Sequence, residues 1–150
     1  MSTPGNQVDG MLGMARILIV EDNDAMRVFM AQALERIGHD VDTAPDAESA
    51  ENLLTAKTID LLLADIELPG ENGVELARRA VGRHPDLRVI FVTGFAEMAA
   101  RAADFLAKKP RILSKPFGLS DLTTQVSAML KGGAPPSGGD VANQGETAQA

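Results

Sequence analysis

Acidic residues that directly follow predominantly apolar runs are the first sign of chemistry in this sequence. Glu21 and Asp22 come after the run 16–20, and Asp65 comes after the run 59–64. Carboxylates that crowd together repel one another and resist joint ionisation unless a cation lies between them. Their hard oxygen atoms suit Mg²⁺, which retains several of its waters. If these residues meet in the fold, the sequence predicts a magnesium site.

A hydroxyl and an ammonium stand at equivalent places. Thr93 follows the run 88–92, and Lys115 follows the run 111–113 after one serine. Asp65 is the best nucleophile candidate, because the apolar run before it would fix its backbone. A carboxylate can attack a phosphoryl group to form an acyl phosphate, while Mg²⁺ and a positioned lysine neutralise charge on the phosphoryl oxygens. Lys115 is suited to reach such an oxygen, and Thr93 can donate its hydroxyl to it.

Ordinary structural roles are also open to these residues. Asp22, Asn23 and Asp24 are all competent helix caps. Thr93 with the glycine after it fits turn chemistry, and Lys115 before a proline fits an extended residue leaving a strand. The joint occurrence of suitable groups at the ends of four strands favours phosphoryl chemistry over these separate explanations.

The elements that would position these residues alternate along the chain. We expect strands at 16–20, 41–44, 59–64, 88–92 and 111–113. We expect helices at 25–37, 46–54, 73–84, 97–106 and 119–130. This alternation predicts an α/β fold, with a five-stranded parallel sheet, right-handed crossovers and helices on both faces. Ligands of such sheets bind beyond the carboxyl ends of the strands, where the residues above stand.

Two helices carry apolar stripes that predict their buried faces. The stripe of the first helix comprises Met26, Phe29, Met30, Ala33, Leu34 and Ile37. The stripe of the last comprises Leu119, Leu122, Val126 and Met129. We also expect Asp46 to cap the helix after it, and His39 to be a surface or capping residue.

Composition limits the classes of partner. The 21 acidic residues outnumber the 14 basic ones, and the net charge of -7 has the wrong sign for direct binding of nucleic acid. No apolar run approaches the roughly 18 residues that span a membrane. Residues 1–13 lack the features of a secretory signal and the chain has no cysteine, which favours the cytoplasm. Residues 1–13 and 131–150 are expected to be disordered tails around a domain at 14–130.

Four motifs, in this order and spacing, resemble the response regulator receiver domain of two-component and phosphorelay signalling. They are ILIVEDND, LLLADIELPGENGVEL, VIFVTGF and ILSKPF, and the resemblance covers residues 14–130. It implies a flavodoxin-like, doubly wound sheet with strand order 2-1-3-4-5. It also implies phosphorylation of Asp65 and Mg²⁺ held by Glu21, Asp22, Asp65 and the backbone carbonyl of Glu67.

The resemblance further implies how such a domain signals. A phosphohistidine on a histidine kinase or a histidine phosphotransfer protein donates the phosphoryl group, and the receiver catalyses only its own phosphorylation and dephosphorylation. Thr93, Gly94 and Phe95 would move toward the phosphoryl group, with Lys115 as its cation. The position that usually carries the switch aromatic is Ile112, so the sequence departs from the family pattern there.

A docking surface and the identity of the partners follow from the same resemblance. In the family, the phosphohistidine helix of the partner docks beside the first helix and the loop after the lysine. The corresponding residues are Met26, Pro116, Phe117 and Gly118. The bond between Lys115 and Pro116 is usually cis in this family, which would aim Lys115 into the pocket.

Several alternatives stay open. The chain resembles CpdR-type single-domain regulators, which implies a stand-alone regulator of proteolysis or the cell cycle acting on a downstream protein target. It also resembles receivers fused to hybrid kinases. An unphosphorylated adaptor and an aspartyl-phosphate phosphohydrolase are rival functions. The carboxylate of Glu67 either orients a hydrolytic water or faces solvent.

Overall fold

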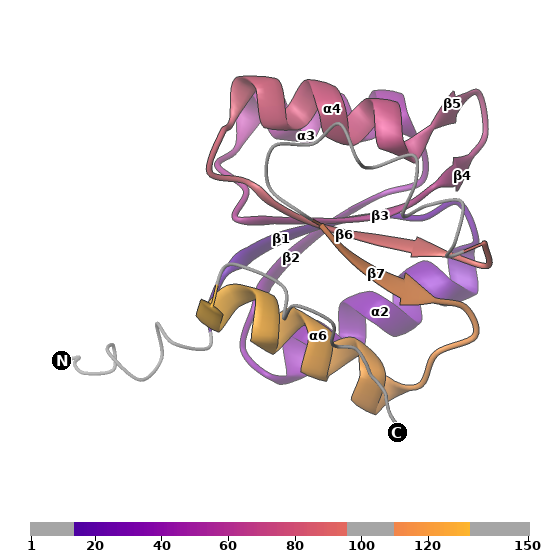
Figure 1. Ribbon diagram of the computed structural model, residues 1–150, viewed down its shortest axis with the longest axis vertical. Coiled ribbons are helices and arrows are strands. Elements are labelled where there is room, and N and C mark those ends of the chain that lie inside the picture. The colour runs from indigo at the N-terminus through magenta and orange to yellow at the C-terminus, as the bar shows by residue number, and fades with distance from the viewer. Residues whose placement is uncertain (1–13, 96–109, 133–150) are drawn as a thin grey trace, which may run out of the picture.

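Five parallel strands form the central sheet of the molecule (Figure 1). The computed structural model describes residues 14–95 and 110–132. The strands are β1 (Arg16–Val20), β2 (Asp40–Ala44), β3 (Leu61–Asp65), β6 (Arg88–Thr93) and β7 (Arg111–Ser114). Their order in the sheet is β2-β1-β3-β6-β7. Because β6 and β7 are the fourth and fifth strands that the sequence predicts, the α/β class and the order 2-1-3-4-5 are confirmed.

Helices cover both faces of this sheet. Helices α2 (Asp24–Arg36) and α6 (Leu119–Gly132) lie on one face, and α3 (Ala47–Ala56) and α4 (Gly73–Arg83) lie on the other (Figure 1). The predicted helix at 97–106 lies outside the described residues, as do residues 1–13 and 133–150. Helix α6 continues to Gly132, so the predicted tail does not begin at residue 131. No helix in the described ranges is long and apolar enough to cross a membrane.

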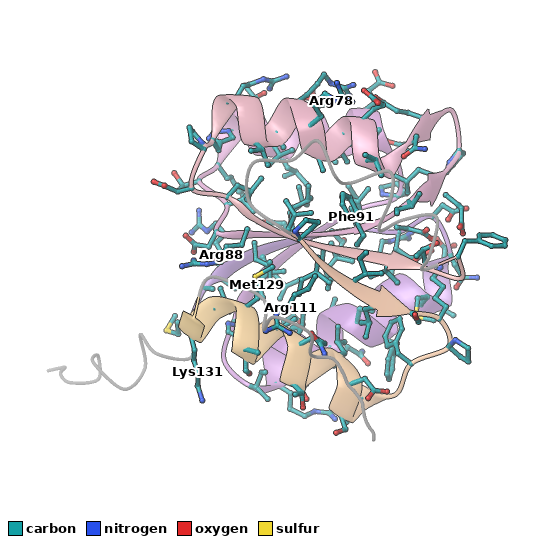
Figure 2. The ribbon with its side chains drawn as sticks, viewed as in Figure 1. Arg78, Arg88, Phe91, Arg111, Met129 and Lys131 are labelled. Carbon is teal, nitrogen blue, oxygen red and sulfur yellow. The ribbon has the colours of Figure 1, made fainter. Side chains whose placement is uncertain are left out.

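Alternating side chains of the inner strands supply two separate cores. On β1, Leu18 and Val20 join the cluster under α3 and α4, while Ile17 and Ile19 join the cluster under α2 and α6. The same alternation on β6 directs Phe91 toward α4, whereas Met129 of α6 points up to the opposite face (Figure 2). Both faces of strands β1, β3 and β6 are covered, which explains why each is apolar except at its ends.

Some predicted boundaries and stripes are wrong. Strand β3 begins at Leu61 and not at residue 59, although Ile59 is buried. Phe29 and Ile37 of the first stripe are 38% and 43% exposed, and Leu119 of the last is 45% exposed. Ile37 is the C-cap residue of α2 and Leu119 is the first residue of α6, so these two lie at helix ends, whereas Phe29 lies within α2 on its partly exposed side.

A two-stranded hairpin precedes α4 and was not expected. Its strands β4 (Glu67–Leu68) and β5 (Glu71–Asn72) pair antiparallel around Pro69 and Gly70. Gly70 has φ of 79°, which fits the third position of a type II turn with proline before it. The hairpin fixes the chain directly after Asp65.

Candidate functional site

The strand ends meet at one edge of the sheet. Val20 of β1 pairs with Ala64 of β3, Asp65 pairs with Val92 of β6, and Thr93 pairs with Ser114 of β7. These registers bring the residues at or just after the strand ends side by side. The groups that the sequence placed at four separate strand ends therefore occupy one site.

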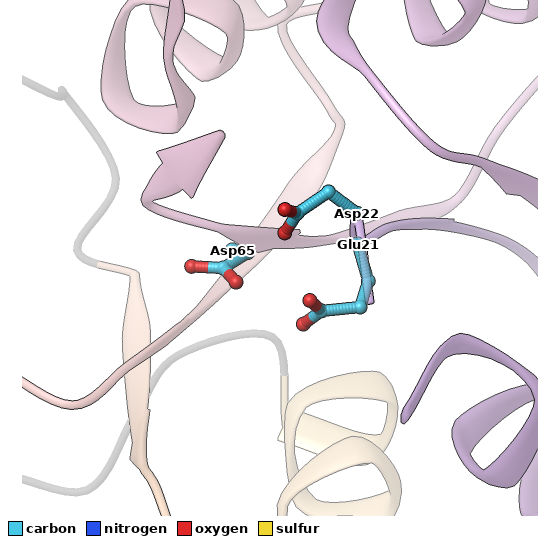
Figure 3. Close-up of side chains that lie close together, drawn as sticks. All are labelled: Glu21, Asp22 and Asp65. Atoms are coloured by element: carbon cyan, nitrogen blue, oxygen red, sulfur yellow. The ribbon is translucent and has the colours of Figure 1, made fainter. Parts of the chain in front are cut away.

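Three carboxylates lie close together in this site. One oxygen each from Glu21, Asp22 and Asp65 lies within 4.8 Å of the others (Figure 3). Glu21 and Asp65 are buried, with 1% and 3% of their surface exposed, whereas Asp22 is exposed. Neither Glu21 nor Asp22 caps helix α2, because Asn23 is the cap and its Oδ1 accepts from the Met26 N–H at 2.8 Å. The capping explanation of the acidic pair is therefore wrong.

Burial changes the acidity of Glu21. Removal of the carboxylate from water raises its pKa, and the charge of Asp65 raises it further. The hydrogen bond from the Asn23 N–H and the charge of Lys115 oppose this rise in pKa without cancelling it. Arg27 donates through Nη1 to the backbone carbonyl of Glu21 at 2.9 Å, and this hydrogen bond holds the Glu21 backbone in place.

Lys115 supplies the cation of the site. Its Nζ donates to Oδ2 of Asp65 at 2.8 Å and lies 3.3 Å from Oε1 of Glu21. The Lys115–Pro116 bond is cis, as the resemblance implied. Burial of the ammonium favours a lower pKa, but the hydrogen bond and charge of Asp65, with the charge of Glu21, raise the pKa of Lys115 overall. One ammonium faces three carboxylates, so the site retains an excess of negative charge.

The donor set fits a hard divalent cation. Oε1 of Glu21 is buried and accepts no hydrogen bond within the described part of the chain, although Lys115 lies near it. Asp22 and Asp65 add oxygen ligands from the same edge. An all-oxygen set with an exposed member leaves room for the waters that Mg²⁺ retains.

Thr93 is buried and hydrogen-bonded on both sides. Its hydroxyl donates to Oε2 of Glu67 at 2.8 Å, and Oγ1 accepts from the backbone N–H of Phe95 at 3.0 Å. The Glu67 N–H in turn donates to Oδ1 of Asp65 at 2.8 Å. The carboxylate of Glu67 thus has a specific protein partner, which neither sequence hypothesis for this side chain included.

Comparison with known proteins assigns the family. Residues 17–127 match the response regulator receiver domain. The chain belongs to this family. It is 42% identical over 117 residues to the response regulator receiver protein CpdR of Brucella abortus (strain 2308), covering 78% of this chain and 98% of that protein. It is 35% identical over 121 residues to the sensor kinase CckA of the same strain, covering 79% of this chain and only 13% of the kinase.

A solved structure of a similar response regulator contains Mg²⁺. The response regulator TrrA of Thermotoga maritima, in complex with Mg²⁺-BeF, superposes with a TM-score of 0.66 at 28% identity. The match covers 77% of this chain and 99% of that one. Receiver domains bind Mg²⁺ at an acidic pocket, and the cluster of Glu21, Asp22 and Asp65 is the acidic pocket of this receiver.

The predicted switch residues lie where the receiver's sheet ends. Gly94 is exposed and Phe95 is 60% exposed, directly after buried Thr93. Ile112 on β7 is partly buried and packs against the cluster that contains Phe91. An aliphatic side chain therefore fills the core at the position where the family usually carries an aromatic ring.

The predicted docking residues lie on one surface beside Lys115. Pro116 and Gly118 are exposed, and Met26 and Phe117 are half-buried. The ring of Phe117 lies 6.5 Å from that of Phe29, measured between centroids. An open pocket of about 320 Å³ on this surface is lined by Asn23, Ala25, Met26, Phe29 and Lys115. Phe29 was assigned to the core from its helical spacing, so its place on this surface was missed.

The start of α4 also touches the site, through Gly73. Its N–H donates to the Ile66 carbonyl at 2.8 Å. A Cβ at Gly73 would overlap the backbone oxygen of Asp65 and stand 3.0 Å from the Cα of Ile66. Only a glycine lets the helix approach the nucleophile this closely. This role of Gly73 was not predicted. A glycine at the start of a predicted helix hints at such a close approach, but the sequence alone does not distinguish it from an ordinary turn residue.

Proposed function

We propose that this receiver is a stand-alone phosphorelay response regulator that accepts a phosphoryl group on Asp65. The observation that carries this proposal is the arrangement of a buried Asp65 between an ammonium at 2.8 Å and two further carboxylates. Similarity to CpdR along nearly all of that protein's length supports a single-domain regulator. The cytoplasm is the proposed compartment.

The transfer follows from the position of each group. A carboxylate oxygen of Asp65 attacks the phosphorus of a phosphohistidine, an O–P bond forms, and the P–N bond breaks with its electron pair left on the imidazole nitrogen. Lys115 already donates to Asp65 and would pair with a phosphoryl oxygen. Thr93 would donate its hydroxyl to another. These two contacts neutralise charge that the reaction concentrates beside Asp65.

Glu21, Asp22 and Asp65, with the backbone carbonyl of Glu67, would hold Mg²⁺. When bound, the ion supplies positive charge to offset the phosphoryl oxygens. The excess of carboxylates over ammonium groups at the site supports this assignment. The chain's own catalysis is limited to phosphorylation and dephosphorylation of Asp65.

The proposed donor is a histidine kinase or a histidine phosphotransfer protein. Met26, Pro116, Phe117 and Gly118 would receive it, and we add Phe29 because its ring lies beside Phe117. The output is binding to a downstream protein target. Control of the cell cycle or of proteolysis is the pathway that the resemblance to CpdR-type regulators implies.

Intact-mass spectrometry after incubation with Mg²⁺ and acetyl phosphate tests this function. We expect a gain of one phosphoryl group that requires Mg²⁺ and is lost in Asp65→Asn. Asp40→Asn is the matched control, because it makes the same change at the amino end of β2, at the opposite edge of the sheet, where exposed Asp40 pairs with Arg16. Absence of the modification with acetyl phosphate and with a phosphorylated histidine protein would favour an unphosphorylated adaptor. Steady hydrolysis of varied phosphate esters would favour a phosphohydrolase.

A further inference from the structure

The hydroxyl of Thr93 already has an acceptor in the unphosphorylated protein. A threonine hydroxyl carries one proton and can donate it to one acceptor at a time. Here that acceptor is Oε2 of Glu67, at 2.8 Å. If Thr93 is to donate to a phosphoryl oxygen on Asp65, it must first release Glu67.

Glu67 is not free to follow Thr93 when it moves. Its backbone N–H donates to Oδ1 of Asp65 at 2.8 Å, and Glu67 pairs with Asn72 in the hairpin that precedes α4. Asn72 is itself the N-cap of α4, with its Oδ1 accepting from the Val74 N–H at 2.6 Å. The backbone of Glu67 is thus tied to the nucleophile on one side and to the start of a helix on the other.

We propose that Glu67 is a positioning residue for the switch, whose carboxylate holds the Thr93 hydroxyl in the unphosphorylated state. This inference rests on the proposed function. The phosphoryl group on Asp65 and the carboxylate of Glu67 are two anionic acceptors that compete for one proton. Glu67 therefore sets how readily the receiver switches, in addition to the role proposed for its backbone carbonyl.

Two variants distinguish the hydrogen bond between Thr93 and Glu67 from a general effect of negative charge. Glu67→Gln removes the charge but keeps an oxygen that can accept from Thr93, whereas Glu67→Ala removes both. Glu71→Gln is the control for loss of charge in the same hairpin, because Glu71 pairs with Arg79 and not with Thr93.

NMR of the free protein provides a readout that does not depend on phosphorylation. We expect the Thr93 methyl signal, identified by its loss in Thr93→Val, to shift strongly in Glu67→Ala and to stay near its wild-type position in Glu67→Gln and Glu71→Gln. Three-bond couplings would report the accompanying change in the Thr93 χ1 angle. An unchanged Thr93 signal and χ1 in Glu67→Ala would overturn the inference.

Binding of beryllofluoride, a phosphoryl mimic, with Mg²⁺ gives the second readout. We expect Glu67→Ala to bind it about threefold to tenfold more tightly than Glu67→Gln, the range of one neutral hydrogen bond between the Thr93 hydroxyl and the glutamine oxygen. Equal affinities in these two variants would overturn the inference alone. Failure of every form, wild type included, to bind beryllofluoride would instead overturn the proposed function.

Discussion

Replacement of Gly73 by alanine tests how closely α4 must approach the nucleophile. The added Cβ would overlap the Asp65 carbonyl oxygen and stand 3.0 Å from the Asp65 carbonyl carbon and the Ile66 Cα, against an optimum of about 3.5–4.0 Å between carbon atoms. All three neighbouring atoms belong to backbone, so no side chain can rotate away. Relief requires α4 to move outward or the Asp65 peptide to rotate.

The size of the effect follows from two opposing terms. Overpacking at a rigid site costs about 1–3 kcal/mol, while alanine in place of glycine favours a helix by at most about 1 kcal/mol. Gly82, in the same helix, has open space at its Cβ position, so Gly82→Ala carries only the favourable term. Because both variants share the favourable term, we expect Gly82→Ala to be the more stable of the two by the overpacking cost alone, about 1–3 kcal/mol.

Urea unfolding followed by far-ultraviolet circular dichroism measures this difference, since the chain has no tryptophan or tyrosine for fluorescence. Calorimetric titration with Mg²⁺ gives a second measurement. We expect weaker Mg²⁺ binding in Gly73→Ala than in Gly82→Ala, because displacement of the Asp65 backbone moves its carboxylate. Equal stability of the two variants, with equal Mg²⁺ affinity, would refute the close-approach argument.

The remaining predictions concern charge and docking. Because the folded-state pKa of Lys115 is raised, its contribution to stability is present below pH 10.5 and is lost as the pH rises above that value. The free energies of unfolding of wild type and Lys115→Met, measured with urea, should therefore approach each other above pH 10.5. Because the pKa of Glu21 is raised in the folded state, its contribution to stability is present below pH 4.5 and is lost as the pH rises above that value. We therefore expect the free energy of unfolding of Glu21→Gln to increase relative to that of wild type as the pH rises. A difference in unfolding free energy that does not change with pH would contradict the burial argument. Phe29→Ala should slow transfer from a phosphohistidine protein about tenfold while the reaction with acetyl phosphate, which needs no docking, changes little. Ile37→Ala, a comparably exposed residue at the far end of α2, is the control, and equal slowing there would remove Phe29 from the docking surface.

Apolar patterning was enough to predict a parallel sheet, whereas the order of its strands followed from the family resemblance. Strands β1, β3 and β6 are buried on both faces, so they read as unbroken apolar runs that a helix period does not explain. The edge of a helix stripe is harder to assign, because spacing alone does not say how wide a face the sheet can cover. Phe29 and Ile37 fall inside the predicted stripe yet lie outside the core.

The gathering of Glu21, Asp65 and Lys115 was also predictable, since parallel strands must end at the same edge. Contacts that depend on short irregular segments were not. His39 was expected to be a surface or capping residue, but it is buried, and its Nδ1 accepts from the N–H of Ala15, which lies outside any helix, at 3.1 Å. That contact arises from the parallel pairing of β1 and β2, which brings Ala15 beside residue 39, and a single histidine in the sequence carries no sign of it.

Because residue 112 is isoleucine and not an aromatic residue, we expect the switch to depend more on Gly94 and Phe95, which follow β6. Ile112 packs in the core and has neither a ring to expose nor a hydroxyl to pair. Phe95 is 60% exposed, and its N–H donates to the same Thr93 oxygen whose proton Glu67 accepts. A change in the Thr93 hydroxyl therefore acts directly on the backbone that carries an exposed ring. In this receiver we expect Phe95, and not residue 112, to be the aromatic side chain that reports the state of Thr93 at the surface.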